Sequence, residues 1–365
     1  MKIKGMKMRK LVLSVLIICT SIGYTQTAEI KGKVFGDYFY NLKNNEQTSK
    51  EMNGFLLRRF YFTFENQLTD NIKMRFRLDA KHADFGEKEK LHPFIKNAYL
   101  EWNNILPQHK LYVGISNANI IVNSQDYWGY RSIEETITGV NKISSSADMG
   151  LALKGDLNQY VHHWLTVFNG TGYGSSEMDK YKKLGYSLWI TPVNGMILEG
   201  YIDYEKQDPK TGTYKPAADY FHSTGYRTVK GFIGYQNPGF TLGGEVFSRT
   251  NFQSGAADSS GNSKTDVFKT GFSLFGHFSV IKSKLKAFFR YDFFDPNTDD
   301  KVYIDPGING YKDEETLIIA GLDVTVENTF HIMPNIIITA YRNDNINNDI
   351  TARITFSYNY KTEKF

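Results

Sequence analysis

The feature that most constrains this chain is an alternation of apolar and polar residues with a period of two. A β-strand projects successive side chains to opposite faces, so such a segment has one apolar and one polar face. Residues 71–81 show the pattern most clearly, because their polar face is almost entirely basic. The apolar face comprises Ile72, Met74, Phe76, Leu78 and Ala80, and the charged face comprises Lys73, Arg75, Arg77, Asp79 and Lys81.

Sixteen segments carry this alternation, and most are about ten to fourteen residues long. Strands of soluble proteins usually have about five or six residues, whereas a strand tilted across a bilayer needs about 9–11. The length therefore favours strands that cross a membrane. The segments are 29–42, 55–68, 71–85, 93–103, 109–116, 147–157, 160–169, 181–192, 195–205, 226–237, 240–251, 265–279, 283–294, 314–327, 331–342 and 350–361.

The connections between these segments alternate between long and short, as in 117–146 against 158–159 and 193–194. Long loops on one rim and tight turns on the other are typical of outer-membrane barrels, in which a closed sheet satisfies every backbone group. We predict an all-β fold, a transmembrane antiparallel β-barrel of about 16 strands with long extracellular loops and short periplasmic turns. A secreted soluble sandwich array or propeller is the alternative, but no repeat of about 40–45 residues supports a propeller.

The first 25 residues have the order of a secretory signal, with a basic start, an apolar run over 11–19 and small or polar residues to follow. The run is short for a membrane anchor, the alternative interpretation, which needs about 20 residues. We expect residues 1–25 to be a cleaved signal peptide and residues 26–365 to form a single barrel domain in the cell outer membrane. Without the five basic residues of this leader, 38 basic residues face 39 acidic ones, so the net charge of +4 becomes −1 and does not support nucleic-acid binding.

The basic face of 71–81 is the sharpest candidate for a functional site. If the apolar face meets lipid, the basic side chains must line the lumen, because a charge on the lipid side costs about 2–4 kcal/mol at mid-bilayer. Rings of Arg or Lys are a means by which pores select anions. The predicted anion path consists of Arg59, Lys73, Arg75, Arg77 and Lys81. Alternatively, these residues pair with Glu65, Asp79 and Glu101 and only satisfy a polar lumen. Arg58 has the opposite parity, so we expect it to face outward.

The connection 117–146 is long enough to be functional and is predicted to fold into the lumen as a constriction loop. A loop packed over the outer rim is the alternative. The mixture of charges among its candidates argues against a purely anion-selective constriction. The candidate lining residues are Asp126, Tyr127, Trp128, Tyr130, Arg131, Glu134 and Glu135.

Three segments within about 55–155 resemble the phosphate-selective porin O/P family of bacterial outer-membrane porins. They are the Arg-Arg hairpin 55–81, the pair Asn-Ala-Tyr-Leu-Glu-Trp and Leu-Tyr-Val-Gly-Ile-Ser within 97–116, and Ser-Ser-Ala-Asp-Met-Gly-Leu-Ala-Leu-Lys-Gly at 145–155. The resemblance implies a sixteen-stranded barrel, often a homotrimer, that passes anions such as phosphate by diffusion. The stretch after Gly114 departs from the family's usual Gln- and Pro-containing run.

Other chemistry has little support in the sequence. His162 and His163 are adjacent on a strand, so they point to opposite faces and cannot chelate one metal together. We therefore expect no metal site and no cofactor, and in the absence of a local Ser/His/Asp arrangement we expect no enzyme. The predicted function is passive diffusion of small solutes with a bias to anions, with membrane lipid as the surrounding partner. A weakly selective general porin and a surface adhesin or receptor, based on loops such as 206–225, are the alternatives.

Overall fold

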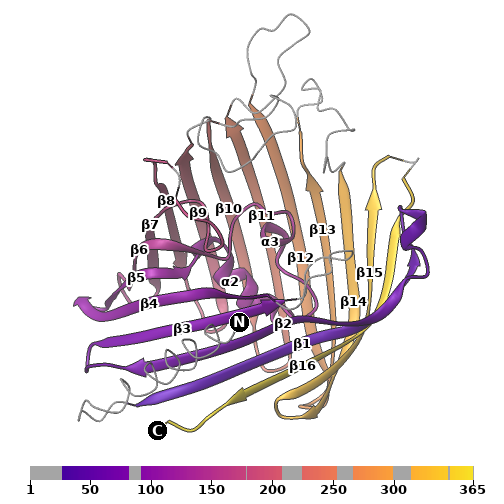
Figure 1. The fold of residues 1–365 in the computed structure, drawn as a ribbon, viewed down its shortest axis with the longest axis horizontal. Helices are drawn as coiled ribbons and strands as arrows, with labels where there is room; N and C mark the ends of the chain where they lie inside the picture. Colours follow the sequence, from indigo (N-terminus) through magenta and orange to yellow (C-terminus); the bar gives the residue numbers. More distant parts are fainter. Residues whose placement is uncertain are drawn as a thin grey trace, which may run out of the picture.

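A computed structural model of the chain describes residues 27–81, 92–177, 179–207, 224–252, 266–298, 314–343 and 346–364. These residues form sixteen strands in one closed antiparallel barrel, in which each strand pairs with its neighbours in sequence and β1 pairs with β16 (Figure 1). The predicted fold is therefore confirmed. The strands are β1 (Ala28–Lys43), β2 (Asn53–Gln67), β3 (Ile72–Lys81), β4 (His92–Leu106), β5 (His109–Asn117), β6 (Ala147–Asp156), β7 (Val161–Phe168), β8 (Lys183–Ile190), β9 (Met196–Lys206), β10 (Gly225–Gln236), β11 (Phe240–Phe252), β12 (Val267–Ile281), β13 (Leu285–Asp295), β14 (Glu315–Glu327), β15 (Phe330–Tyr341) and β16 (Asp349–Lys361).

The two faces of the barrel differ as the alternation predicts. The outer face presents large apolar side chains, for example Val246 at 58% exposure and Leu274 at 54%. Charged and polar side chains such as Glu65, Asp79 and Arg290 are buried inside. An apolar exterior with a polar lumen is the arrangement of a barrel surrounded by lipid.

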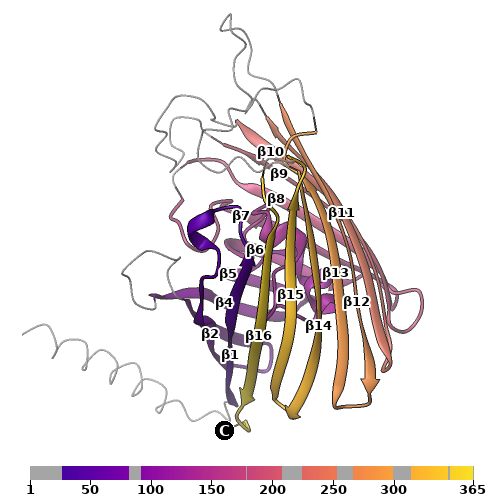
Figure 2. The same ribbon diagram turned by 90° about the vertical axis from the view of Figure 1, so that its right-hand side faces the viewer.

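The described ranges contain three short helices between the strands: η1 (Gln47–Ser49), α2 (Asn119–Trp128) and α3 (Ile137–Val140). Helices α2 and α3 belong to the connection between β5 and β6, and both views of the ribbon place them within the ring of strands (Figures 1 and 2). Among the described residues, no helix is long and apolar enough to cross a membrane. The predicted signal peptide and most of the 206–225 loop lie outside the described residues.

Two β-bulges change which side chains face the lumen. In β2, Arg59 pairs with Phe35 and Leu57 pairs with Gly36, so Arg58 is an extra residue without a partner in the register. In β4, Asn97 pairs with Arg77 and Ile95 pairs with Leu78, which leaves Lys96 as the extra residue. A bulge inserts one residue and can redirect a side chain.

The bulge in β2 makes the outward placement of Arg58 wrong. Its guanidinium donates a hydrogen bond to the Ser132 carbonyl oxygen at 3.2 Å, and it lies 3.5 Å from a carboxylate oxygen of Glu134 and 3.7 Å from one of Asp37. All three partners lie inside the barrel. Arg58 and Arg59 therefore both point inward, which regular alternation does not allow.

Candidate functional site

The connection 118–146 crosses the lumen and is fixed to one wall of the barrel, formed by β8–β14. Helix α2 is held by Lys230 of β10, whose Nζ donates to the Ile120 carbonyl oxygen and, at 3.0 Å, to Ser124 Oγ. The same Nζ lies 3.2 Å from a carboxylate oxygen of Glu245 and 3.6 Å from one of Glu199. A buried charge needs such complete pairing, because an unpaired one is costly.

Aromatic packing fixes the segment that follows α2. Trp128 is fully buried, and its ring meets Phe275 of β12 and Phe288 of β13 edge to face, at centroid distances of 5.7 and 6.2 Å. Tyr130 stacks on Phe288 and donates a hydrogen bond to the Asp323 carboxylate at 3.1 Å. Such edge-to-face and stacked contacts add to the burial of the rings.

The end of this segment contacts strands from both sides of the barrel. Arg290 of β13 donates to the Glu135 carbonyl oxygen, while Arg58 of β2 reaches Ser132 and Glu134 from the opposite side. Burial alone would raise the pKa of Glu134, but the charges of Arg58 and Arg353 outweigh it and hold this pKa below its usual range. Glu134 is therefore ionised at neutral pH and stabilises the loop.

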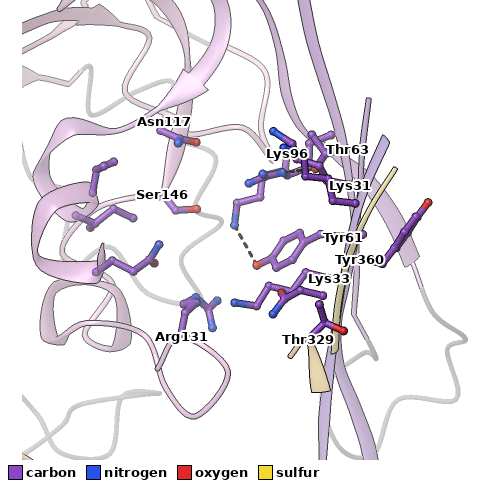
Figure 3. A pocket seen from close by; sticks show the side chains of 17 residues that line it. Lys31, Lys33, Tyr61, Thr63, Lys96, Asn117, Arg131, Ser146, Thr329 and Tyr360 are labelled. Carbon is purple, nitrogen blue, oxygen red and sulfur yellow. Dashed lines mark hydrogen bonds between the residues drawn. The ribbon is translucent and has the colours of Figure 1, made fainter. Parts of the chain in front are cut away.

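A cavity of about 450 Å³ remains between the connection 118–146, which we call the inner loop, and a wall formed mainly by β1–β4, with the end of β16 at its edge. Figure 3 shows Lys33 and Arg131 extending toward each other across it, and Lys96 directed at the hydroxyl of Tyr61. Six of its lining residues are basic and none is acidic: Lys31, Lys33, Arg77, Lys96, Arg131 and Lys361. This excess of one sign distinguishes the cavity from the barrel as a whole.

Four of these residues, Lys33, Arg77, Lys96 and Arg131, form what we call the basic cluster. They lie against two neighbouring rings of the wall, Phe35 and Tyr61, whose centroids are 6.0 Å apart. The cation centres of Lys33 and Arg131 are each 5.8 Å from the Phe35 centroid, and those of Arg77 and Lys96 are 5.6 and 5.1 Å from the Tyr61 centroid. A cation–π contact orients a cation without cancelling its charge.

Carboxylates neutralise the cluster only in part. Lys96 lies 3.6 Å from an Asp79 oxygen, and Arg131 pairs with Glu135. Arg77 instead donates a hydrogen bond to the Thr63 hydroxyl at 2.8 Å. In the part of the chain that the structure describes, no carboxylate lies within ion-pair distance of Lys33 or Arg77.

The five residues of the predicted anion path have three different outcomes. Arg59 is paired with Asp79 at 2.8 Å, and both Lys73 and Arg75 are paired with Glu65, so these three fit the alternative of a satisfied polar lumen. Arg77 lines the cavity. Lys81 ends β3 and is not among the residues that line this cavity.

The seven loop candidates also divide. Arg131 alone of them lines this cavity. Trp128, Tyr130 and Tyr127 pack against the opposite wall, where burial and the Asp323 carboxylate raise the pKa of Tyr130. The three acidic candidates do not line the cavity. Glu134 and Glu135 form ion pairs, and Asp126 is exposed.

Lys33 and Lys96 are not among the lining residues predicted from the sequence. Lys33 lies on the same face of β1 as Lys31 and Phe35, and the apolar Val34 lies on the other face. The period-two pattern therefore contains a signal for the inward placement of Lys33. Lys96 faces the lumen only because of the bulge in β4, for which the sequence offers no comparable signal. No group of three or more His, Cys, Asp or Glu suited to a metal ion occurs among the described residues.

Comparisons with known proteins bear on the fold. No protein-family profile matches the sequence, and no curated protein matches it. Among solved structures, OmpF of Salmonella typhi is similar with a TM-score of 0.64 at 10% identity, over 91% of this chain and 97% of that one. The outer membrane channel DcaP of Acinetobacter baumannii gives 0.66 at 10% identity over 92% and 97%. The anion-selective porin of Comamonas acidovorans gives 0.62 at 10% identity over 92% and 100%. The chain therefore has the fold of bacterial outer-membrane porins.

Proposed function

We propose that this barrel is an outer-membrane pore through which small solutes diffuse passively, with a preference for anions. One observation carries the proposal: the cavity between the inner loop and the β1–β4 wall is lined by six basic residues and no acidic one. The loop contributes Arg131 to this lining, so both sides of the cavity are positive. A permeating anion would be attracted from both sides, and a cation repelled.

The expected strength of this preference follows from Coulomb's law. At about 6 Å in water, one unpaired cation attracts a monovalent anion by about 0.7 kcal/mol and repels a monovalent cation equally. Lys33 and Arg77 together would favour an anion over a cation by about 3 kcal/mol before screening by salt. That is enough for clear selectivity and too little to trap the anion, so diffusion continues.

The zero-current potential of the purified protein in a planar bilayer under a KCl gradient tests the proposal. Conductance steps with a potential of the anion-selective sign are expected. A potential near zero or of the opposite sign would instead support a weakly selective general porin, in which Glu65, Asp79 and Glu135 neutralise the wall. The absence of conductance would contradict a pore of either kind.

Phosphate is the anion we propose as a preferred solute. The basic cluster offers several N–H donors around one cavity, and Arg side chains can give two parallel hydrogen bonds to a phosphate. The resemblance of 55–155 to the phosphate-selective porins points in the same direction. Added phosphate should then reduce the chloride current in a concentration-dependent manner. An effect no larger than that of sulfate would leave general anion selectivity without phosphate preference.

We also propose that the mature chain, without residues 1–25, assembles as a homotrimer in the outer membrane. The resemblance stated above and the porin fold support this arrangement, and OmpT of Vibrio cholerae, another structure of similar fold, is described in a trimer form. Native mass spectrometry of the protein extracted from outer membranes should give three copies of a chain that lacks the leader. A monomer, or an intact leader, would contradict the respective part of the proposal.

A further inference from the structure

A pair of histidines on the outer face of the barrel is independent of the lumen. His109 of β5, Gly155 of β6 and His163 of β7 stand directly opposite one another in the register of three neighbouring strands. His163 lies on the same face as the exposed Leu165, and His109 on the same face as the exposed Val113. The pair lies at the short-turn rim, next to the turns 107–108 and 157–160.

The two imidazoles are aimed at each other across the middle strand. Their Nε2 atoms are 2.9 Å apart, and Nδ1 of His109 lies 2.6 Å from the Pro107 carbonyl oxygen. A carbonyl only accepts hydrogen bonds, so Nδ1 of neutral His109 carries the proton and Nε2 presents its lone pair. Donation of the second ring N–H to a backbone carbonyl is the usual arrangement of a metal-binding histidine.

Gly155 provides the space for this arrangement. A Cβ atom at this position would lie 2.3 Å from Cδ2 and 2.7 Å from Nε2 of His109, well inside van der Waals contact. The imidazole of His109 therefore passes over β6 because that strand has no side chain there. Strands β5 and β7 thus each provide one histidine, and β6 provides the space between them.

We propose that His109 and His163 form a two-imidazole binding site for Cu²⁺. Two nitrogens at about 2.0–2.1 Å from a metal and at a right angle to each other are about 2.9 Å apart, which matches the observed separation. Neighbouring nitrogen ligands at right angles are typical of tetragonal Cu²⁺ and Ni²⁺, and Cu²⁺ binds more tightly. Water would complete the coordination, because no third His, Cys, Asp or Glu joins the pair in the described ranges.

The metal-free pair is held by one hydrogen bond, in which Nε2–H of His163 donates to Nε2 of His109. On binding, the proton of His163 moves from Nε2 to Nδ1 and both rings turn from each other toward the metal, so that both Nε2 lone pairs point at it and no proton is lost from neutral rings. The bound ion would join the β4–β5 turn to the β6–β7 turn. Because the pair is brought together only in the folded barrel, binding at this site would raise the thermal midpoint of unfolding.

His162 supplies a matched control. It is the residue before His163, but its ring points to the lumen side, where Nδ1 lies 2.6 Å from an Asp156 oxygen and Nε2 lies 3.1 Å from Thr191 Oγ1. Replacement of His162 changes the number of histidines without changing the proposed pair. The chain has eight histidines, so this control also measures background binding.

The test is a Cu²⁺ titration of the folded, tag-free protein in detergent micelles, followed by electron paramagnetic resonance. We expect one tightly bound Cu²⁺ per chain with hyperfine structure from two imidazole nitrogens. His109→Gln and His163→Gln should each weaken binding at least tenfold, and His162→Gln should not. Gly155→Ala should weaken it to a similar degree without removing a ligand. Circular dichroism and unchanged channel conductance confirm that each variant is folded.

Two results would overturn the proposal. One is the absence of a stoichiometric two-nitrogen signal in the unmodified protein. The other is an affinity that is the same in His109→Gln, His163→Gln and His162→Gln, which would mean that Cu²⁺ binds elsewhere. In either case the two rings form only a hydrogen bond.

Discussion

The two walls of the barrel that face the inner loop use the same kind of side chain for different purposes. On the β8–β14 wall, Lys230 and Arg290 are almost fully buried, and their donors are used by carboxylates and by carbonyl oxygens of the loop. On the β1–β4 wall, Lys33 and Arg77 lie at a cavity and have no carboxylate partner among the described residues. Lys230 and Arg290 are neutralised by their partners, whereas Lys33 and Arg77 keep their charge available.

The surroundings of a cation, and not its presence in the lumen, therefore decide its role. A buried cation with complete pairing fixes structure, because removal of one partner leaves an uncompensated charge. A cation held by aromatic rings and hydroxyls, as Arg77 is by Tyr61 and Thr63, keeps its field. The inner loop separates the two cases because it packs on one wall and leaves space at the other.

The largest effect on stability is expected from Lys230→Met. This change leaves Glu199 and Glu245 buried without their cation, and the loss of one partner of a buried ion pair costs about 3–5 kcal/mol. The urea midpoint of the barrel refolded in lipid vesicles should fall accordingly. The matched change Lys33→Met, on the other wall, should cost less than about 1 kcal/mol. Equal losses in the two variants would contradict the distinction between the walls.

The largest effect on selectivity is expected from the double change Lys33→Glu and Arg77→Glu. Both residues line the cavity, and two charge reversals allow the new carboxylates to neutralise Lys96 and Arg131. The anion-selective zero-current potential should disappear while the urea midpoint stays close to that of the parent. The double change Lys282→Glu and Lys284→Glu, in the exposed turn between β12 and β13, makes the same change in net charge and is the control. An unchanged potential would show that the path lies elsewhere.

The sequence predicts the features of this structure that depend on local alternation, but it does not predict those that depend on contacts between distant residues. The sixteen strands follow from the period-two pattern and agree with the structure to within a few residues at most ends. The same pattern correctly predicts that Arg75 and Arg77 face the lumen. It fails at Arg58, because one inserted residue in β2 reverses the parity, and it cannot identify Lys96 for the same reason.

The candidate site was harder to predict than the strands. Which of several inward cations remains unpaired depends on carboxylates from other strands, such as Glu65, which serves Lys31, Lys73 and Arg75 together. The role of the loop aromatics depends on residues more than a hundred positions away, as Trp128 does on Phe275 and Phe288. The position of these aromatic residues in a long loop therefore predicts that they line the lumen, whereas in the structure they anchor the loop to the wall.

A smaller difference should separate two neighbouring residues of the same strand. Arg77 lines the cavity and Arg75, two residues away on the same face, does not. Because the interaction between charges falls with distance, Arg77→Gln should reduce the anion-selective potential more than Arg75→Gln. The two variants have the same net charge, so each is the control for the other. A larger effect of Arg75→Gln would indicate that the selective site lies near Glu65 and the cations that pair with it.

The smallest effect concerns salt and requires no mutation. The Debye length is about 10 Å at 0.1 M ionic strength and about 3 Å at 1 M, and the cavity is open to solvent. At a fixed ratio of KCl concentrations across the bilayer, the zero-current potential should therefore fall as both concentrations rise. The pairing of Lys230 is buried, so the urea midpoint should depend little on KCl. Selectivity that does not depend on salt would instead arise from close contact with the anion, as in a binding site. Phosphate competition would then be the stronger test of Lys33 and Arg77.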